Sequence, residues 1–510
     1  MAKTKLTPLS KILITLLVAG GVGFGAYKTG LLDYIAPKGK GAENVSNIFS
    51  DEDEVIRVGV VTWGGYAGGE YFNEGFKASK ESRFYKDYGI LVEFVLNDDF
   101  VSSREAWKAG KVDVLWATID AFPTEVASFA EFEPQVIFQA DWSRGGDAIV
   151  ARRGIKTVAN LKGKKVAVAP MTPSHTFLLW LLDAGDLSYN DIEIVEAPNA
   201  IDAAAYFKAG RVDAAVVWSP DDEDCVSSVK GASILKNTKV ASNIIADVFF
   251  VKKEYLEKNR EALKSLVEGW MKGAAEINAS ETNKKKAAKI LAEGLNVDEG
   301  FALNAINNAR LCTYGDNVNF YNLAGNFEGV KGEDIYTRMG QVYNKLNLAP
   351  DNLPAWRTVS NSSLIKNISL AGKEHTAEAK KTFTPVTADL KKTKAFSSKS
   401  VSITFPTGAF KLDENAKYII DLKLADLAKA FANARIRIEG NTDNVGNAAN
   451  NKALSLKRAQ AVAEYLEKEH NFDPNRFVIV GNGPDKPVAD NNTEEGRAKN
   501  RRTEFQLLNQ

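Results

Sequence analysis

The chain of 510 residues contains little histidine and little cysteine. Its histidines are His175, His375 and His470, and its cysteines are Cys225 and Cys312. None of them lies at metal-ligand spacing, so the sequence predicts no metal site and no cofactor. The two cysteines fit separate buried thiols as well as they fit a disulfide in an exported chain.

An excess of one charge is also missing, since Lys plus Arg and Asp plus Glu each total 65. A balanced chain argues against nucleic acid as the main partner. Apolar residues make up 45% of the chain and charged residues 25%, which is ordinary for a globular protein. The length exceeds that of a single hydrophobic core, so we expect two or three domains.

The N-terminus carries basic residues followed by an uncharged apolar run, ILITLLVAGGVGFGAY at 12–27. This order marks an export signal whose N-terminus stays in the cytoplasm. The run is short for a spanning helix, which usually needs about 20 residues, but residues 30–32 extend it. Small residues for a cleavage site occur only at 23–25, so we favour a retained transmembrane anchor, residues 1–32, over a cleaved signal.

Beyond a polar linker at 33–54, short β-branched runs alternate with helix-length segments. The runs are VIRVGVVTW, ILVEFVL, VDVLWA, VIFQA, KKVAVAP, IEIVEA, VDAAVVW and DVFFV. This alternation predicts a mostly parallel α/β sheet, and the sequence after about residue 254 predicts helices.

One short sequence occurs twice, as KAGKVD at 108–113 and KAGRVD at 208–213. In each copy a helical segment runs into a glycine, Gly110 or Gly210, and an apolar strand follows. Glycine at the end of a helix suits the left-handed C-terminal cap. The repeat therefore predicts two α/β lobes that each contain the same helix–glycine–strand unit.

The order of motifs across 55–370 resembles the periplasmic substrate-binding proteins for nitrate, taurine and aliphatic sulfonates. The motifs are RVGVVTWGGYAGGEYF, AGKVDVLWA, DWSRGGDAIVARRG, LKGKKVAVAPMTPSHTFLLWLLDAGDL and AGRVDAAVVWSPD. The resemblance implies a periplasmic-binding-protein fold whose two lobes close on a small ligand.

Two loops, WGGYAGGE at 63–70 and PMTPSHTF at 170–177, each join a strand to a helix. Free backbone N–H groups at such helix starts form a natural anion seat, while plain capping and tight turns are the alternative. We expect Ser174 and Thr176 to cap the second helix and to touch the ligand. The candidate ligand residues in these loops are Trp63, Gly64, Tyr66, Thr172, Ser174, His175 and Thr176.

Aromatic and acidic residues occur together at or beside the predicted strand ends, where ligand residues of α/β folds lie. They are Trp63, Tyr66, Trp142, Trp218, Asp120, Asp141 and Asp221. Aromatic rings with carboxylates suit an ammonium group, so a zwitterion or an amine-bearing organic acid is favoured over nitrate. The alternative is that the aspartates cap helices and the tryptophans belong to the core.

The sequence predicts no catalytic residue. His175 is the sole candidate base in this domain, and no nucleophile or partner acid lies beside it at motif spacing. The related fold includes thiamine-pyrimidine synthases, but their Cys-rich motif has no counterpart here. We therefore expect a binding protein rather than an enzyme.

After a Lys/Thr/Ala-rich linker at 371–398, residues 399–510 resemble the OmpA-like peptidoglycan-binding domain, an α+β fold. The motifs are SITFPTGAFKLDENAK, IEGNTDNVG, NNKALSLKRAQAVAEYL and VGNGPDKPVADNNTEEGRAKNRRTEF. In that family the Asp of the TD pair and the Arg of the LSxxRA helix grip diaminopimelate in the peptidoglycan stem peptide. These residues are Asp443 and Arg458 here.

Diaminopimelate is a zwitterion, so an acid for its ammonium and a guanidinium for its carboxylate suit it. Asn451 and Leu454 lie within two turns before Arg458, and Thr442 precedes Asp443, so these three complete the predicted peptidoglycan site. An Asp–Arg salt bridge with a purely structural role is the alternative. Asn500, Arg501 and Arg502 are assigned to folding, and Asn441 stands where the family usually has His.

Together these features predict a periplasmic protein of a Gram-negative-type bacterium, anchored in the inner membrane and bound to peptidoglycan. Its middle domain would capture or sense a small ligand, with an unidentified membrane partner left open. A stator-like or wall-anchoring structural protein is the main alternative. Stators need a membrane carboxylate for ion flow, and residues 12–27 contain none.

Overall fold

The computed structural model describes residues 54–508 except 404, 406 and 407. The predicted anchor at 1–32 and nearly all of the linker at 33–54 lie outside the described residues. Within the described part, no helix combines the length and the apolar character needed to cross a membrane. Cys225 and Cys312 are both buried free thiols, so they do not pair.

The first lobe is built on a six-stranded sheet with the order β11-β4-β10-β3-β1-β2. The strands are β1 (Val55–Val60), β2 (Leu91–Leu96), β3 (Val114–Thr118), β4 (Pro134–Ser143), β10 (Ala246–Lys252) and β11 (Ala309–Leu311). Strand β1 pairs in parallel with β2 and β3, whereas β10 and β4 pair antiparallel with their neighbours. The prediction of a mostly parallel sheet is therefore wrong, because strands that return from the second lobe enter antiparallel.

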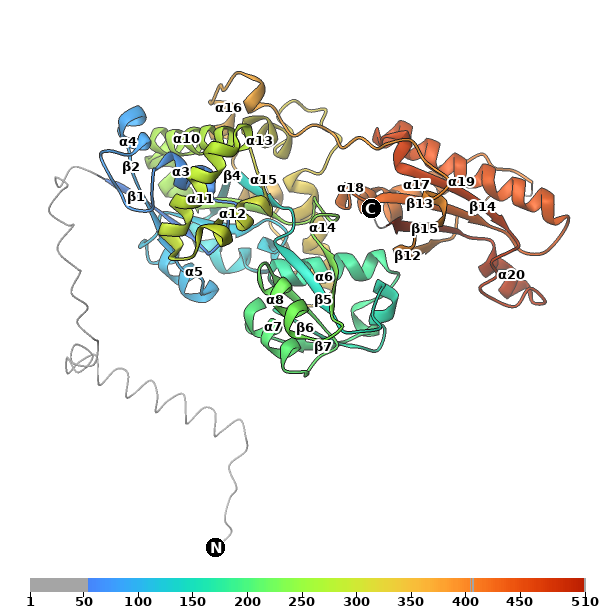
Figure 1. Ribbon diagram of the computed structural model, residues 1–510. Helices are drawn as coiled ribbons and strands as arrows, with labels where there is room; N and C mark the ends of the chain where they lie inside the picture. The colour runs from blue at the N-terminus through green and yellow to red at the C-terminus, as the bar shows by residue number, and fades with distance from the viewer. Residues whose placement is uncertain (1–53, 404, 406–407, 509–510) are drawn as a thin grey trace, which may run out of the picture. The chain divides into compact units, whose positions relative to one another are not determined.

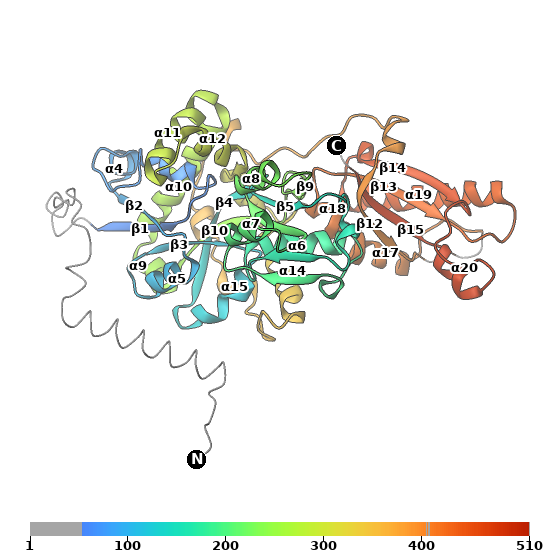
Figure 2. The same cartoon turned by 60° about the horizontal axis from the view of Figure 1, so that its bottom comes forward.

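The second lobe is built on a five-stranded sheet with the order β7-β6-β8-β5-β9. The strands are β5 (Asp147–Ala151), β6 (Lys165–Val168), β7 (Glu193–Glu196), β8 (Ala214–Trp218) and β9 (Ser233–Asn237). Helices α6 (Pro173–Ala184), α7 (Ala200–Lys208) and α8 (Asp221–Ser228) pack on this sheet (Figure 2). The two-lobed α/β prediction is confirmed, and all eight predicted strands are present.

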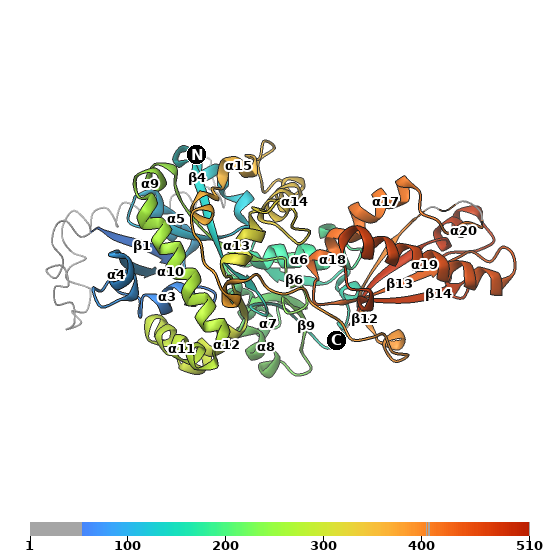
Figure 3. The ribbon, with the colours of Figure 1, turned by 90° about the horizontal axis from the view of Figure 1, so that it is seen from above.

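The first lobe is covered by helices from both the beginning and the end of the domain. They are α3 (Ala67–Phe72), α4 (Arg83–Tyr88), α5 (Phe100–Lys108), α9 (Lys253–Lys258), α10 (Arg260–Ala279), α11 (Glu281–Leu295), α12 (Glu299–Asn307), α13 (Tyr314–Phe320), α14 (Gly332–Lys345), α15 (Trp356–Val359) and α16 (Ser363–Lys366). Helix α10 runs along α3 and α11 (Figure 3). A Cβ on Gly69 would lie 2.4 Å from the Trp270 ring, so the glycines of the first loop serve this helix contact.

The repeated sequence forms the predicted unit in both lobes. Helix α5 is followed by Gly110 at φ 70° and then β3, and α7 is followed by Gly210 at φ 78° and then β8. Left-handed backbone at these two positions is the conformation that favours glycine. The helix–glycine–strand prediction is confirmed.

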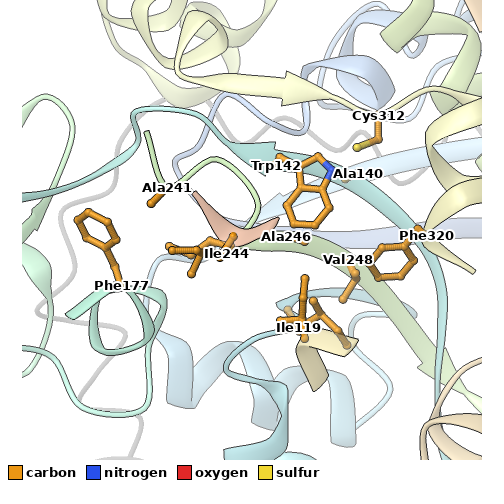
Figure 4. Close-up of a cluster of buried hydrophobic side chains, with 14 of the residues drawn as sticks. Ile119, Ala140, Trp142, Phe177, Ala241, Ile244, Ala246, Val248, Cys312 and Phe320 are labelled. Atoms are coloured by element: carbon orange, nitrogen blue, oxygen red, sulfur yellow. The ribbon is translucent and has the colours of Figure 1, made fainter. Parts of the chain in front are cut away.

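Two chain connections join the sheets of the lobes. Strand β4 leads through residues 144–146 into β5, and β9 leads through residues 238–245 into β10. Apolar side chains beside these connections form part of one buried cluster (Figure 4). Those labelled in the figure are Ile119, Ala140, Trp142, Phe177, Ala241, Ile244, Ala246, Val248, Cys312 and Phe320.

The C-terminal domain has a four-stranded sheet with the order β12-β15-β13-β14. Its strands are β12 (Ala395–Val401), β13 (Arg435–Asn441), β14 (Phe477–Gly483) and β15 (Thr503–Leu508), and its helices are α17 (Glu414–Ile420), α18 (Asp426–Ala430), α19 (Ala448–His470) and α20 (Glu494–Asn500). Helix α19 lies along β13 and β14 (Figure 1). Strand β12 ends at Val401.

The segment predicted as a linker at 371–398 overlaps β12, which begins at Ala395. Its earlier part also has specific partners. Glu378 forms an ion pair with Arg144 at 2.8 Å, and the Phe383 amide donates to the Asp473 carboxylate at 2.8 Å. The segment therefore makes specific contacts, whereas its composition suggests a linker without them.

Candidate functional site

Two aspartates lie side by side on neighbouring strands of the first lobe. In the sheet, Asp247 of β10 stands opposite Thr118 of β3 on one side and Asp141 of β4 on the other. Like charges directly opposite each other destabilise a sheet. Both carboxyls are buried, with exposed fractions of 0% for Asp141 and 6% for Asp247.

Asp147 at the start of β5 and Asp120, two residues after β3, are buried as well. Asp247 and Asp147 both act electrostatically on Asp120, so the four acids face one region. We call Asp120, Asp141, Asp147 and Asp247 the carboxylate cluster. It combines residues from β4, β5, β10 and the end of β3, where the chain passes between the two sheets.

Three carboxylates of the cluster each accept a hydrogen bond from an aromatic or hydroxyl side chain. The bonds run from Trp63 Nε1 to Asp141 at 3.2 Å, from Tyr66 Oη to Asp247 at 2.7 Å and from Ser143 Oγ to Asp147 at 2.9 Å. Asp120 differs, because neither of its oxygens has a hydrogen-bond partner. The second oxygens of Asp141 and Asp147, Oδ1 in both, also lack one.

Burial raises the pKa of every carboxyl in the cluster, because a charged group loses its hydration there. The pKa values of Asp147 and Asp247 rise to about 7. Those of Asp120 and Asp141 rise well above the usual range, and the neighbouring charge of Asp247 adds to the effect of burial on Asp141. The cluster therefore holds protons near neutral pH unless a cation compensates it.

Two glycines permit the close packing around these acids. A Cβ on Gly65 would lie 1.9 Å from Asp141 Oδ2, and one on Gly146 would lie 2.1 Å from the Trp63 ring. Any larger residue at either position would displace Trp63 or the carboxylate. Gly64 packs against a different part of the chain. A Cβ on Gly64 would lie 2.2 Å from the backbone of Ala305, so close packing requires glycine at this position.

The second predicted loop places Thr172 at the N-cap of α6 without a side-chain capping bond. The expectation that Ser174 and Thr176 cap this helix is wrong, because both lie inside its first turn. Ser174 Oγ is buried and has no hydrogen-bond partner. Thr176 shares a hydrogen bond of 2.8 Å with Tyr343 Oη, and its hydroxyl lies near enough to Asp120 to lower the pKa of that carboxyl.

His175 accepts a hydrogen bond at Nδ1 from the Met171 amide at 3.2 Å, while its Nε2 has no partner. Burial lowers the pKa of His175 to about 4, so the imidazole is neutral at physiological pH. Because Nδ1 accepts a hydrogen bond, the proton of the neutral ring is on Nε2, which is therefore a donor.

Two predicted ligand residues lie apart from the buried acids. Asp221 begins α8, where Lys208 and Asp224 are the charges that act on it. Trp142 does not belong to the ligand set, because its ring lies among apolar side chains (Figure 4). It also lines a cavity of about 460 Å³ that no member of the carboxylate cluster lines. Trp218, by contrast, pairs with Asp147 in the β8–β5 register.

In the C-terminal domain, Asp443 follows β13 and is largely buried. Its Oδ2 accepts from Arg501 Nη1 at 2.7 Å, and its Oδ1 accepts from the Val445 amide at 3.0 Å. Arg501, which the sequence assigns to folding, thus makes the ion pair with the predicted ligand acid. Arg501 also binds Glu494 at 2.8 Å, so it bridges two acids.

Arg458 lies on α19 and is half-buried. Its Nε donates to the Ala409 carbonyl at 3.0 Å, and its guanidinium stacks on the Phe405 ring at 4.8 Å. Burial lowers the pKa of Arg458, whereas the charge of Asp443 raises it. Asp443 and Arg458 are therefore close enough to interact electrostatically, as a zwitterion site requires.

The remaining residues of the predicted peptidoglycan site surround this pair. Asn451 donates to the Val445 carbonyl at 2.8 Å, which fixes the loop after Asp443. Thr442 donates to the Asp443 carbonyl at 2.8 Å. Leu454 is partly exposed one turn before Arg458 on α19.

Sequence analysis missed Asp147, Asp247 and Arg501. The run DVFFV predicts a strand, and nothing in its spacing singles out Asp247 as a site residue. Only the cross-strand register shows that it meets Asp141. Among the described residues, no group of three or more His, Cys, Asp or Glu side chains is arranged to hold a metal ion. The carboxylate cluster is therefore not a metal centre of that kind.

Two family models match separate parts of the chain. Residues 404–501 match the OmpA family, and residues 74–281 match the NMT1/THI5-like family. Both predicted resemblances are confirmed by these matches. The chain thus joins a segment that matches the NMT1/THI5-like family to a segment that matches the OmpA family.

Several known proteins resemble parts of this chain. Outer membrane porin F of Pseudomonas aeruginosa is 41% identical over 108 residues, which is 21% of this chain and 30% of that protein. The peptidoglycan-binding protein ArfA of Mycobacterium tuberculosis is 45% identical over 90 residues, 18% of this chain and 27% of that protein. The chain spans less than half the length of the curated relatives it matches.

Among solved structures, the periplasmic aliphatic sulphonate-binding protein SsuA of Escherichia coli aligns with 59% of this chain and 95% of its own. The sequence identity is 19% and the TM-score 0.46.

Proposed function

We propose that this protein is a periplasmic solute-binding protein tethered to the cell wall. The two-lobed domain captures or senses a small zwitterionic or organic-acid ligand at the carboxylate cluster, with Trp63, Trp218 and the start of α6 beside it. The C-terminal domain binds the diaminopimelate of the peptidoglycan stem peptide. A membrane partner would then detect the bound solute or transport it.

The observation that carries this proposal is the pair of oppositely charged side chains, Asp443 and Arg458, in the C-terminal domain. Asp443 presents a carboxylate just after β13 and Arg458 a guanidinium on α19, and both lie within the range that matches the OmpA family. A ligand with an ammonium and a carboxylate on one carbon complements both groups. The match of residues 74–281 to the NMT1/THI5-like family supports the solute-binding half.

The wall-binding half is tested by co-sedimentation of the full chain, in detergent, with two kinds of peptidoglycan. Diaminopimelate-type wall should carry the protein into the pellet. Lysine-type wall lacks the extra carboxylate that Arg458 would bind, so it should retain much less. Equal sedimentation with both walls would contradict recognition of diaminopimelate.

The solute-binding half concerns binding rather than catalysis, and the match of residues 74–281 to the NMT1/THI5-like family supports it. Asp120 is fully buried, so a ligand enters when the lobes separate and is enclosed when they close. A bound ligand raises the melting temperature. A protein that holds its wall contact but melts unchanged with amino acids, amines and sulfonates would instead be a structural wall anchor.

The proposal includes attachment to the inner membrane through residues 12–27. The expected result is that the protein pellets with membranes and that a reporter fused after Gln510 is active only outside the cytoplasm. Recovery of a mature N-terminus near Ala26 would show that this run is a cleaved signal and that the protein is released into the periplasm.

A further inference from the structure

The carboxylate cluster has no basic partner in the part of the chain that the structure describes. Its acids accept hydrogen bonds from Trp63, Tyr66 and Ser143, and the polar groups of Thr176 and Trp218 also act on Asp120 and Asp147. None of these side chains is basic. The basic side chain that acts on this region, through Tyr66, is Arg104. Glu125 holds Arg104 with hydrogen bonds of 2.8 and 3.1 Å, so its charge is already matched.

A second observation is independent of this accumulation of acids. Asp120 is fully buried, and both of its oxygens lack a hydrogen-bond partner, although it faces Asp147 and Asp247. Asp141 Oδ1 and Asp147 Oδ1 are unpartnered as well. Buried polar atoms in folded proteins nearly always have partners, so four unpartnered acceptors in one region indicate donors that come from outside the chain.

The chemistry of these acceptors decides what the donors are. A carboxylate accepts hydrogen bonds and attracts positive charge, so N–H groups on a cation satisfy both requirements. Trp63 lies beside the acids, because its ring N–H donates to Asp141, and Trp218 is the β8–β5 register partner of Asp147. A sulfonate or nitrate would bring its charge against four acids and would supply no donor.

We infer that the carboxylate cluster is the seat of an organic cation that carries N–H donors, a protonated amine or a guanidinium. This inference rests on the proposed solute-binding function and narrows its ligand class. The positive N–H group is required, while an anionic group elsewhere on the ligand is optional. The cation pairs with Asp120 first, because Asp120 alone has both oxygens open.

The test measures melting temperature and affinity for the full chain in detergent at constant ionic strength. The probes are 1,4-diaminobutane and methylguanidine, which carry N–H donors and separate the two cation types. Tetramethylammonium supplies charge without donors, and ethanesulfonate supplies an anion. Glycine and taurine represent zwitterions. We expect diaminobutane or methylguanidine to raise the melting temperature, while tetramethylammonium and ethanesulfonate do not.

Asp120→Asn keeps the size of the side chain and removes its charge, so it should weaken binding of the amine or guanidine by about 30-fold or more. Asp147→Asn serves as a second variant if Asp120→Asn does not fold. Glu70→Gln is the matched control, because Glu70 is a buried acid whose pKa is raised by burial alone and which lies outside the cluster. It should bind like the parent.

The outcomes separate this inference from the proposed function. Stabilisation by ethanesulfonate alone, or equal stabilisation by tetramethylammonium, overturns the inference but leaves solute binding intact. Binding of amines that neither Asp120→Asn nor Asp147→Asn weakens also overturns it. If no amine, guanidine, sulfonate or amino acid stabilises the protein, both the inference and the solute-binding proposal fail.

Discussion

The two candidate sites of this protein handle charge in opposite ways. The carboxylate cluster has four buried acids and no basic partner, whereas Asp443 in the C-terminal domain is already paired with Arg501 and lies near Arg458. Burial raises the pKa values of the first set, while Asp443 has a guanidinium group as its ion-pair partner. A ligand therefore supplies the missing charge at the first site, and replaces or joins existing partners at the second.

This difference predicts that single-residue truncation has its largest effect on wall binding. Asp443→Ala or Arg458→Ala leaves one charge of diaminopimelate unpaired, at a cost of about 2–5 kcal/mol for a desolvated pair. Co-sedimentation with diaminopimelate-type peptidoglycan should therefore fall to near background for each variant.

The control is Asp485→Ala, which removes an exposed partner of Lys452 outside the site and should sediment like the parent. If Asp443→Ala and Arg458→Ala also sediment like the parent, both residues are structural. The contrast between the two sites would then lose its functional meaning.

The unliganded cluster makes stability depend on pH. Asp147 and Asp247 have pKa values of about 7 when folded, against about 4 when unfolded. Between these values the unfolded chain binds fewer protons, so the free energy of unfolding falls as pH rises from about 4 to about 7. Each titrating group contributes up to about 1.4 kcal/mol per pH unit.

Urea unfolding across this range measures the slope, and Asp147→Asn should flatten it. The other titratable groups that face these acids are Tyr66, Asp120 and Asp141; burial raises the pKa of each, so Asp120 and Asp141 add to the fall in stability above about pH 4. His175 opposes this slope, because burial lowers its pKa to about 4 and the unfolded chain therefore binds the imidazole proton between about pH 4 and 6.5 while the folded chain does not. Stability that rises from pH 4 to 7 in the parent would show that the acids are charged when folded.

A smaller effect, on stability, is expected from substitution of Gly146, against which the Trp63 ring packs. Gly146→Ala places a methyl group 2.1 Å from the Trp63 ring, so it should cost about 1–3 kcal/mol of unfolding free energy through overpacking. Gly300→Ala, at an exposed helical position of α12, should be neutral or stabilising by up to about 1 kcal/mol.

Combination with Trp63→Ala identifies the cause, because it removes the side chain that the new methyl group meets. The cost of Gly146→Ala should then largely disappear. A cost that stays unchanged without Trp63 would mean that Gly146 matters for another reason.

The smallest expected effect concerns Arg501. Its ion pair with Asp443 is partly exposed, with side-chain exposure of 41% for the arginine, so Arg501→Ala should cost no more than about 1 kcal/mol of stability. Chemical denaturation measures this change. A loss of several kcal/mol would show that Arg501 holds the domain together rather than merely balancing Asp443.

The elements of the fold were more predictable than the site they form. Apolar β-branched runs identify strands locally, and a glycine after each repeated helix identifies its end, so both lobes follow from short-range patterns. Strand β5 was missed because Gly145, Gly146 and Asp147 interrupt the apolar pattern just after β4. The direction of β10 was also missed, since it depends on how the chain returns from the second lobe.

The carboxylate cluster depends on register across three strands, which sequence spacing does not reveal. Asp141 was predicted as a ligand residue, but its neighbour Asp247 lies more than 100 residues away and pairs with it only through the β10–β4 register. Asp443 and Arg458 were accessible to sequence analysis because their motifs are local. Arg501 was not, because its ion pair with Asp443 spans the domain.

The most direct test of the central claim is the number of protons released when 1,4-diaminobutane binds the full chain. Calorimetry at pH 6 in two buffers with different heats of ionisation measures this number. Because a bound cation requires the acids of the cluster to ionise, we predict net proton release at pH 6, less release at pH 8, and reduced release in Asp147→Asn. Binding with identical heats in both buffers, or no binding of the amine, would contradict the account.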